Sequence, residues 1–398
     1  MSKLLYTPKS EIDSRIEKVQ AGMKKLKCDG AVITQYSDLF YLSGTSQNGH
    51  LYIPQSGEPV LMIKKSYERA RNESPLENII DLKSIKKMPD IIKNTGYSSL
   101  KVLGFELDVI PYNNYLFYRK IFDPSEFIDI SGLIKSVRVI KSSYEIDLLR
   151  KACSVIDDVY KDVPGMIREG MTEVELASLF EAGMRRRGYG GCCNMRAFNQ
   201  NLFLGNVVSG SSGAVPTYFD GPIGGTGLTP ANKPHGAGWK KIQRDEIIYI
   251  DYTCVVNGYT ADEARMFVIG KVSDRLKHAF DAAMEIQKEL TTMLKPSVEC
   301  QIIYEKALEL ADRFGYSNNF MGMGDDRVKF VGHGVGLELD ESPIFAKGVR
   351  MPLEPGMTFA IEPKFVFPDG AIGIENTFVM RNNGAETLTL ANEDLISI

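Results

Sequence analysis

Four acidic residues stand inside apolar, strand-like segments in the second half of the chain. They are Asp251, Asp262, Glu362 and Glu375. The dipeptide Asn257-Gly258 separates the first two, and Asp369-Gly370 separates the last two. Because such dipeptides favour two-residue turns, we predict two β-hairpins, each of which carries two carboxylates.

The expected register places both carboxylates of each hairpin on one face. In the first hairpin, Asp262 would lie opposite Thr253, which is two residues from Asp251. In the second, Glu375 would lie opposite Lys364, which is two residues from the other glutamate. Side chains alternate between the faces of a strand, so each pair of acids would share a face at the same diagonal offset.

Carboxylates gathered in strands rich in Ile, Val and Phe require cations, because buried like charges repel one another. His333, in the segment Gly332-His333-Gly334-Val335-Gly336 between the hairpins, would add one nitrogen ligand, and its glycine neighbours permit close backbone approach. Such ligands suit manganese, cobalt or iron, and two ions about 3.5–4 Å apart would share bridging carboxylates and a water. We therefore predict a two-metal site that activates water; the alternative is that the acids lie on solvated faces.

The elements ahead of each hairpin have the same predicted order. Ser142 and Thr172, each with a glutamate three residues later, form capping boxes that begin two helices ahead of the first hairpin. Helical spacing of apolar residues over 274–294 and 302–314 predicts two more helices ahead of the second. The order helix, helix, hairpin thus occurs twice, which predicts a duplicated domain with the site between its hairpins.

The chain length of 398 residues suits two or three domains. The pattern of apolar residues over roughly the first 140 positions predicts a smaller α/β unit, with a helix over 15–26 and strands over 30–34 and 51–53. We expect an N-terminal domain over 1–140 and a catalytic domain over 141–398. The predicted fold class is therefore a two-domain α/β protein with an α+β second domain.

Composition narrows the classes of partner. The 47 Lys and Arg residues against 51 Asp and Glu residues give a net charge of −4, so no basic excess favours nucleic acid. The polar N-terminus shows neither a signal peptide nor a membrane span, which makes a cytoplasmic location the default expectation. No Cys-x-x-Cys pair occurs, and we expect reduced core thiols, with Cys254 on the face opposite Asp251. The six cysteines are Cys28, Cys153, Cys192, Cys193, Cys254 and Cys300.

Several motifs together resemble the pita-bread metallopeptidases, the family of aminopeptidase P, prolidase and methionine aminopeptidase, with creatinase as a metal-free relative. The carrying residues are Asp251, Gly258-Tyr259, Asp262, Arg265, the Gly-His-Gly-Val-Gly segment at His333, Glu341, Pro343, Gly356-Met357, Ile361-Glu362-Pro363 and Ile374-Glu375. The segment from Val137 to Ser142, followed by Glu145, is similar to the junction between a creatinase/prolidase-type N-terminal domain and a catalytic domain.

The resemblance implies a role for each matching residue. Asp251 would bind one metal, Asp262 and Glu375 would bridge two, and His333 with Glu362 would hold the second. Glu362 would also accept a proton from the bridging water and pass it to the leaving amine. Arg265 would keep a bridging carboxylate oriented from behind.

Two positions depart from the family pattern. Asp340 stands where these peptidases carry a second His that supports the substrate carbonyl, and Gly373 stands where they carry an Arg. His235, which follows Pro234, lies within one residue of another substrate His of the family, so we expect a catalytic or substrate-binding role for it. Asp340 and the loop residue Tyr218 are further candidates for contact with substrate.

The leading expectation is a dinuclear metallohydrolase, an Xaa-Pro dipeptidase or aminopeptidase, with manganese first among the metals and cobalt, iron or zinc as others. The resemblance also implies a homodimer that acts on small peptides. One alternative is a pita-bread enzyme for a small non-peptide amide, amidine or osmolyte, which Asp340 and Gly373 favour. Another is a catalytically silent binding protein. Of the remaining histidines, His278 is expected in solvent and His50 beside a turn, or near a dimer partner's site.

Overall fold

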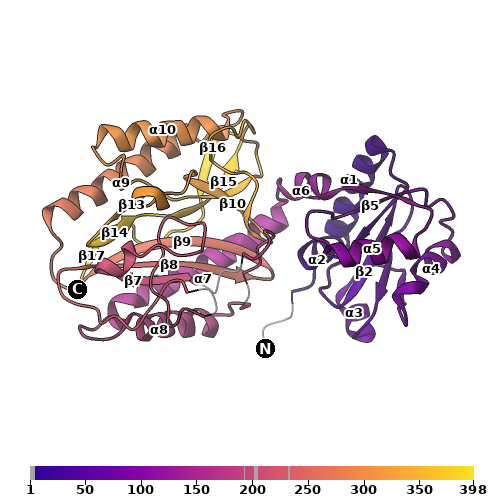
Figure 1. Cartoon of the computed structure of the whole chain (residues 1–398), viewed down its shortest axis with the longest axis horizontal. Coiled ribbons are helices and arrows are strands. Elements are labelled where there is room, and N and C mark those ends of the chain that lie inside the picture. Colours follow the sequence, from indigo (N-terminus) through magenta and orange to yellow (C-terminus); the bar gives the residue numbers. More distant parts are fainter. Residues whose placement is uncertain (1–4, 192, 201–204, 232–233) are drawn as a thin grey trace. The chain divides into compact units, whose positions relative to one another are not determined.

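The computed structural model describes residues 5–191, 193–200, 205–231 and 234–398 (Figure 1). The chain divides into two compact units, one that ends at Arg138 and one over Val139–Ile398. We propose the domain boundary between residues 140 and 141, in the connection that separates α6 (Ser131–Arg138) from α7 (Ser143–Met166). Within the described residues, no helix has the length and apolar character needed to cross a bilayer.

The first unit is built on one six-stranded sheet, in the order β4-β3-β2-β1-β5-β6. Its strands are β1 (Gly30–Ile33), β2 (Gly49–Pro54), β3 (Val60–Ile63), β4 (Ile79–Asp81), β5 (Val102–Phe105) and β6 (Glu126–Asp129). Its helices, besides α6, are α1 (Lys9–Leu26), α2 (Tyr36–Ser43), α3 (Tyr67–Glu73), α4 (Met88–Asn94) and α5 (Tyr112–Ile121). The predicted helix and both predicted strands of this unit are confirmed, and α1 buries Ile16, Val19 and Met23 of the stripe that predicted it, whereas Leu26 is exposed.

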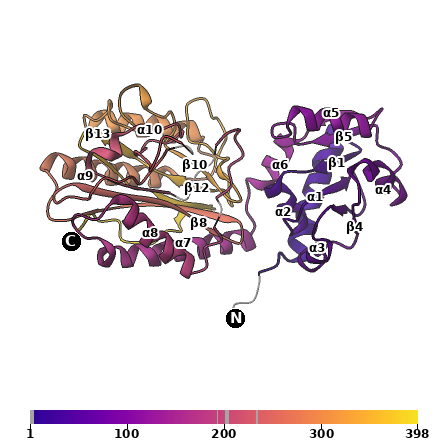
Figure 2. The same cartoon turned by 60° about the horizontal axis from the view of Figure 1, so that its bottom comes forward.

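The second unit begins with the two predicted helices, α7 and α8 (Glu173–Arg186), and both capping boxes are present. Ser142 Oγ accepts a hydrogen bond from the backbone N–H of Glu145, whose carboxylate accepts one from the N–H of Ser142. The predicted second pair is also present, as α9 (Asp274–Met293) and α10 (Cys300–Arg313). Figure 2 shows helices on both sides of the strands in this unit. The repeated order of elements is therefore confirmed.

Three sheets form the strand layer of the second unit. A four-stranded sheet has the order β17-β9-β8-β7, a five-stranded sheet has the order β11-β10-β12-β15-β16, and β13 pairs with β14. The strands are β7 (Gly205–Ser209), β8 (Ile247–Val256), β9 (Tyr259–Val268), β10 (Gly332–Val335), β11 (Leu339–Glu341), β12 (Thr358–Ile361), β13 (Lys364–Phe367), β14 (Gly370–Gly373), β15 (Asn376–Arg381), β16 (Gly384–Thr387) and β17 (Ile396–Ser397). A large apolar core, which includes Phe280, Phe359 and Phe365, packs against them.

The first hairpin has the predicted register. Strands β8 and β9 pair antiparallel with Thr253 opposite Asp262 and with Asn257-Gly258 as the turn. Asp251 and Asp262 therefore share a face, and Cys254 lies fully buried on the other face, as expected.

The predicted register of the second hairpin is wrong. Lys364 lies opposite Gly373 and not opposite Glu375, because the strands turn through residues 368 and 369, one position earlier than predicted. The hairpin is also interrupted: β12 pairs with β15 in one sheet, and β13 pairs with β14 in another. Pro363 explains the interruption, since proline has no N–H to donate to a strand ladder. Glu362 and Glu375 both fall in this gap, opposite one another and not at a diagonal offset.

Other expectations from the sequence can be compared directly. Cys28, Cys153, Cys193, Cys254 and Cys300 are buried, as expected, and form no disulfide with one another, whereas Cys192 lies outside the described residues. His278 is exposed, as expected. His50 is not a turn neighbour, because it lies buried within β2 and its Nε2 is 2.7 Å from the Tyr118 hydroxyl.

Candidate metal centre

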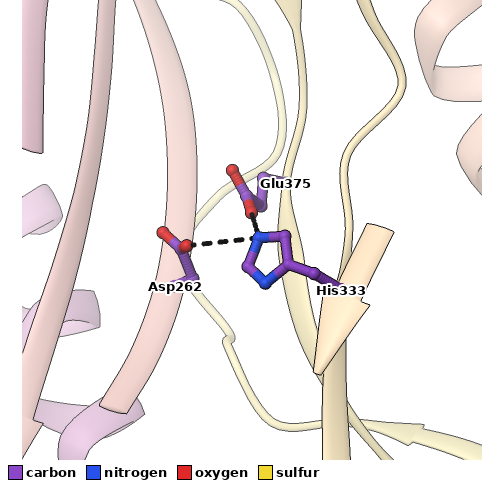
Figure 3. Close-up of side chains that lie close together, drawn as sticks. All are labelled: Asp262, His333 and Glu375. Carbon is purple, nitrogen blue, oxygen red and sulfur yellow. Dashed lines mark ion pairs between the residues drawn. The ribbon is translucent and has the colours of Figure 1, made fainter. Parts of the chain in front are cut away.

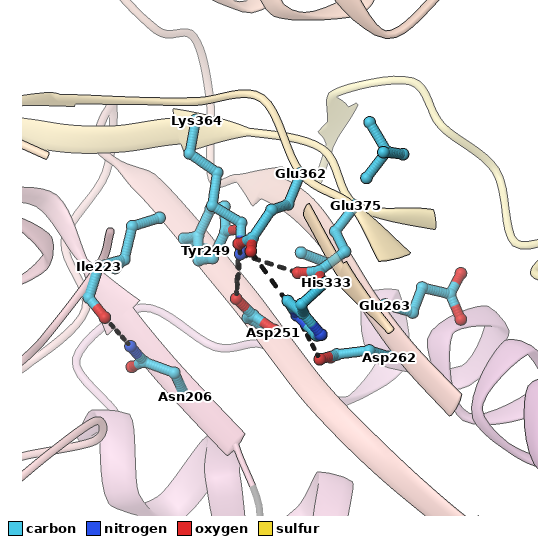
Figure 4. A network of polar contacts seen from close by, with 12 residues as sticks. Asn206, Ile223, Tyr249, Asp251, Asp262, Glu263, His333, Glu362, Lys364 and Glu375 are labelled. Carbon is cyan, nitrogen blue, oxygen red and sulfur yellow. Dashed lines mark hydrogen bonds and ion pairs between the residues drawn. The ribbon is translucent and has the colours of Figure 1, made fainter. Parts of the chain in front are cut away.

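The residues proposed as metal ligands from the sequence line one cavity in the second unit. Figure 4 shows their carboxylates and imidazole pointing toward one another from the two hairpins and from β10. Two hydrogen bonds hold the halves of the unit together here, since Thr377 on β15 exchanges them with the backbone N–H and C=O of Asp262 on β9. The glycines around His333 permit the close approach of β10, because a Cβ at Gly332 would lie 2.3 Å from the carbonyl oxygen of Ala360.

Asp262, His333 and Glu375 form a compact, buried group that could hold a metal ion (Figure 3). His333 Nε2 lies 3.7 Å from Asp262 Oδ2 and 3.7 Å from Glu375 Oε1. Two buried oxygens, Asp262 Oδ1 and Glu375 Oε1, make no hydrogen bond within the part of the chain that the structure describes. Buried carboxylate oxygens without donors are costly, and a divalent cation at this position would satisfy them, so these residues fit a metal.

The opposite nitrogen of the His333 ring faces Asp340. Nδ1 lies 3.3 Å from Asp340 Oδ1 and 3.3 Å from the carbonyl oxygen of Gly334. Two acceptors at Nδ1 favour the tautomer with its proton there, which leaves the lone pair of Nε2 for a metal. Asp340, expected from the sequence to contact substrate, lines the same cavity as His333 and lies directly against its ring.

Lys364 lies at the centre of the carboxylate group, and the sequence did not identify it as a site residue. Its Nζ is 2.8 Å from Asp251 Oδ2, 2.7 Å from Glu362 Oε2 and 2.8 Å from Glu375 Oε2 (Figure 4). The side chain is 3% exposed. The available signal was its place in the predicted hairpin, two residues from Glu362 and near the second glutamate.

Burial and neighbouring charges together raise the pKa values of this group. Burial, reinforced by Glu375 and Asp251, raises the pKa of Asp262 well above its usual range, and burial raises that of Glu375 to about 8. Burial alone would lower the pKa of Lys364, but the three carboxylates around it raise that pKa well above its ordinary value. The ammonium is therefore fixed in its charged form and neutralises part of the acidic group.

The predicted substrate residues fall in two places. His235 lines the cavity with Asp251, its Nδ1 lies 3.1 Å from Thr217 Oγ1, and burial lowers its pKa to about 4. Its imidazole is therefore neutral at pH 7. Tyr218 is 44% exposed and lines a neighbouring cavity instead, while Asp220 borders both cavities.

Arg265, expected to keep a bridging carboxylate oriented, contacts Glu375 through the backbone carbonyl oxygen of that residue. It donates hydrogen bonds to the carbonyl oxygens of Glu375, Ala264 and Ala391 and to Asn376 Oδ1. Its Nη2 also lies 2.8 Å from Glu263 Oε1, inside the protein. Arg265 thus fixes the chain at Glu375 from the side of β9 that faces away from the cavity.

Comparisons with known proteins agree with this architecture. Residues 147–382 match the model of metallopeptidase family M24, and residues 15–140 match the creatinase/prolidase N-terminal domain. The Xaa-Pro dipeptidase of Pyrococcus furiosus is 28% identical over 386 residues, which cover 96% of this chain and 99% of that protein.

Solved structures show the same two-domain fold. The prolidase of Pyrococcus horikoshii OT3 has a TM-score of 0.81 at 26% identity, with 96% of this chain and 100% of that chain covered. The Xaa-Pro dipeptidase of Bacillus anthracis has a TM-score of 0.82 at 25% identity, with 97% and 100% covered. The fold is therefore a creatinase/prolidase-type N-terminal domain followed by a pita-bread catalytic domain. The family is known for divalent-metal hydrolases, and the chain belongs to metallopeptidase family M24.

Proposed function

We propose that the chain is a metal-dependent dipeptidase that hydrolyses dipeptides with proline in the second position. The observation that carries this proposal is the buried group of Asp262, His333 and Glu375, which lines a cavity and whose carboxylates each keep one oxygen without a donor among the described residues. The relatives named Xaa-Pro dipeptidase and prolidase support the choice of a dipeptide over a longer peptide.

Asp262, His333, Glu362 and Glu375 would hold the metal, and Asp251 completes the acidic group. A bound divalent ion would supply an activated water and polarise the scissile carbonyl. Glu362 is 3% exposed, and its Oε1 lies 3.6 Å from His333 Nε2, so it can accept a proton at the metal position and return it to the leaving amine.

His235 would bind substrate through its neutral imidazole. Its ring lies 5.1 Å from that of Phe219, and both residues border the same cavity as Glu362. A neutral histidine accepts or donates one hydrogen bond at Nε2, which suits contact with a peptide group. Asp340 would act through His333 by fixing the orientation of its ring.

We propose manganese as the metal, since carboxylates with one imidazole and no thiolate suit it, as they also suit cobalt and iron. We also propose a homodimer, which rests on the resemblance to the family, and a cytoplasmic location, which the buried cysteines without a disulfide among the described residues support.

The test is a hydrolysis assay on the full chain, supplied with manganese, that compares an Xaa-Pro dipeptide with the matched Xaa-Ala dipeptide and an Xaa-Pro tripeptide. We expect release of free proline from the first and little turnover of the second. Turnover of the tripeptide alone would replace the dipeptidase with an aminopeptidase. Absence of peptide turnover by metal-loaded protein would overturn the proposal and favour a non-peptide amide substrate or a binding protein.

A further inference from the structure

We propose that the ammonium group of Lys364 permanently occupies one of the two cation positions of this site, so that the chain binds one divalent ion where the sequence led us to expect two. The inference rests on the proposed function for its metal position at Asp262, His333 and Glu375. It concerns the other position, which Asp251 and the two glutamates surround.

The two oxygens of each glutamate face different cation positions. Oε2 of Glu362 and Oε2 of Glu375 lie within 2.8 Å of Lys364 Nζ. Oε1 of Glu362 and Oε1 of Glu375 lie 3.6 and 3.7 Å from His333 Nε2. A carboxylate that bridges two metal ions places one oxygen on each ion. Each glutamate has the same arrangement here, with the lysine ammonium in place of one ion.

Asp251 supports the same assignment. The resemblance gave it to one metal only, and in the structure its Oδ2 bonds Lys364 Nζ at 2.8 Å. The atoms around Nζ are thus three carboxylate oxygens from three residues, a set of oxygen ligands typical of a hard divalent cation. The ammonium donates hydrogen bonds to Asp251 and Glu375 and forms an ion pair with Glu362, so it satisfies the same oxygens without a metal.

Gly373 provides the room for this lysine. It lies directly opposite Lys364 in the β13–β14 ladder, where cross-strand side chains would normally meet. A Cβ at residue 373 would lie 2.6 Å from Lys364 Cγ and 2.9 Å from Lys364 Cα. Any larger side chain here would collide with the stem of the lysine. Gly373 is one of the two departures from the family pattern noted in the sequence. Its lack of a side chain is therefore what makes room for Lys364.

A second metal ion would have to displace a buried, fully paired charge. The Lys364 side chain is 3% exposed, and its Nζ also lies 5.8 Å from the centre of the Tyr249 ring. Two cations cannot share the same three oxygens, since like charges at that distance repel strongly in a buried site. Four carboxylates carry four negative charges, of which one divalent ion and the ammonium neutralise three.

This substitution changes what the site requires. Removal of metal would leave the acidic group partly neutralised, so the cavity keeps its form in the metal-free protein. One metal ion, at the His333 position, would be sufficient to activate water for hydrolysis. Lys364 would supply a positive charge at the position of the second ion.

The experiment is a count of bound metal. Full-length protein is dialysed to equilibrium against excess manganese, and the manganese per chain is measured by elemental analysis for the wild type, Lys364→Ala and Lys141→Met. Lys141 is a matched control, because it is also a buried lysine of the second unit, and its ion pair at 2.6 Å is with Glu341, which is not one of the four carboxylates of this group. We expect about one ion in the wild type, about two in Lys364→Ala and about one in the control.

Two ions per wild-type chain would overturn the inference, and so would a single ion in folded Lys364→Ala. If Lys364→Ala fails to fold, the wild-type count still decides. The outcomes separate this inference from the proposed function. Xaa-Pro hydrolysis with two bound ions would overturn only the role of Lys364, whereas one bound ion without hydrolysis would overturn only the proposed activity. Protein without bound metal would overturn both.

Discussion

Replacement of Asp340 by Asn should weaken metal binding without removing a ligand. Asp340 Oδ1 lies 3.3 Å from His333 Nδ1, on a backbone with a φ of 62° that Asn adopts as readily as Asp. Loss of a carboxylate partner behind a metal-binding histidine typically costs 10- to 100-fold in affinity, or about 1.4 to 2.7 kcal/mol. Because the carboxylate is 32% exposed and the contact is long, we expect about a 10-fold loss, the lower end of that range.

The assay is a competition titration of manganese between the protein and a fluorescent chelator at fixed pH. Asp394→Asn serves as a matched control, since it removes an exposed carboxylate near the C-terminus. The dissociation constant should rise about 10-fold in Asp340→Asn and stay at the wild-type value in the control. Equal dissociation constants in the wild type and Asp340→Asn would refute the role of Asp340 in orienting His333.

Three further predictions concern other parts of the molecule. Glu362→Gln, assayed at saturating manganese, should lose about 10²- to 10⁴-fold in turnover, because the proton acceptor is gone; near wild-type turnover would contradict this. Arg265→Met should lower the free energy of unfolding in urea by about 3–5 kcal/mol, because it breaks the buried pair with Glu263 and removes the donors to buried carbonyl oxygens at Ala264 and Glu375; a loss below about 1 kcal/mol would show that these contacts matter little. Burial, with a smaller contribution from Lys64, lowers the pKa of His50 from 6.5 to about 4. As pH falls, His50 is therefore protonated in the unfolded chain before it is protonated in the folded protein, so stability is lost between about pH 6.5 and pH 4. Between pH 7 and 5, wild-type stability should therefore fall about 2 kcal/mol more than that of His50→Gln, and equal losses would argue against a buried neutral histidine.

Local signals in the sequence predicted most of the elements. Capping boxes at Ser142 and Thr172 fix helix starts through side-chain contacts three residues apart, and such contacts can be recognised from spacing alone. The Asn257-Gly258 turn likewise set the register of the first hairpin. The second hairpin differed because Asp369-Gly370 did not supply both turn residues and because Pro363 divided the ladder, which depends on the surrounding sheets.

The candidate ligands could be predicted because their chemistry is distinctive and because both hairpins repeat it. The positions of Lys364 and Asp340 could not. A lysine on a strand is usually at the surface, and only the contacts of its Nζ with Asp251 and the two glutamates show that Lys364 turns inward. Asp340 faces His333 through the pairing of β11 with β10, which no short-range pattern revealed.

The most direct test of the central claim is the release of proline from one Xaa-Pro dipeptide by chelator-treated protein, before and after manganese is restored, for the wild type and Asp262→Asn. We expect no activity in the metal-free wild type, recovery on addition of manganese, and no recovery in Asp262→Asn. Undiminished hydrolysis by the metal-free wild type, or full recovery in Asp262→Asn, would contradict the claim that a metal held by Asp262, His333 and Glu375 activates the water.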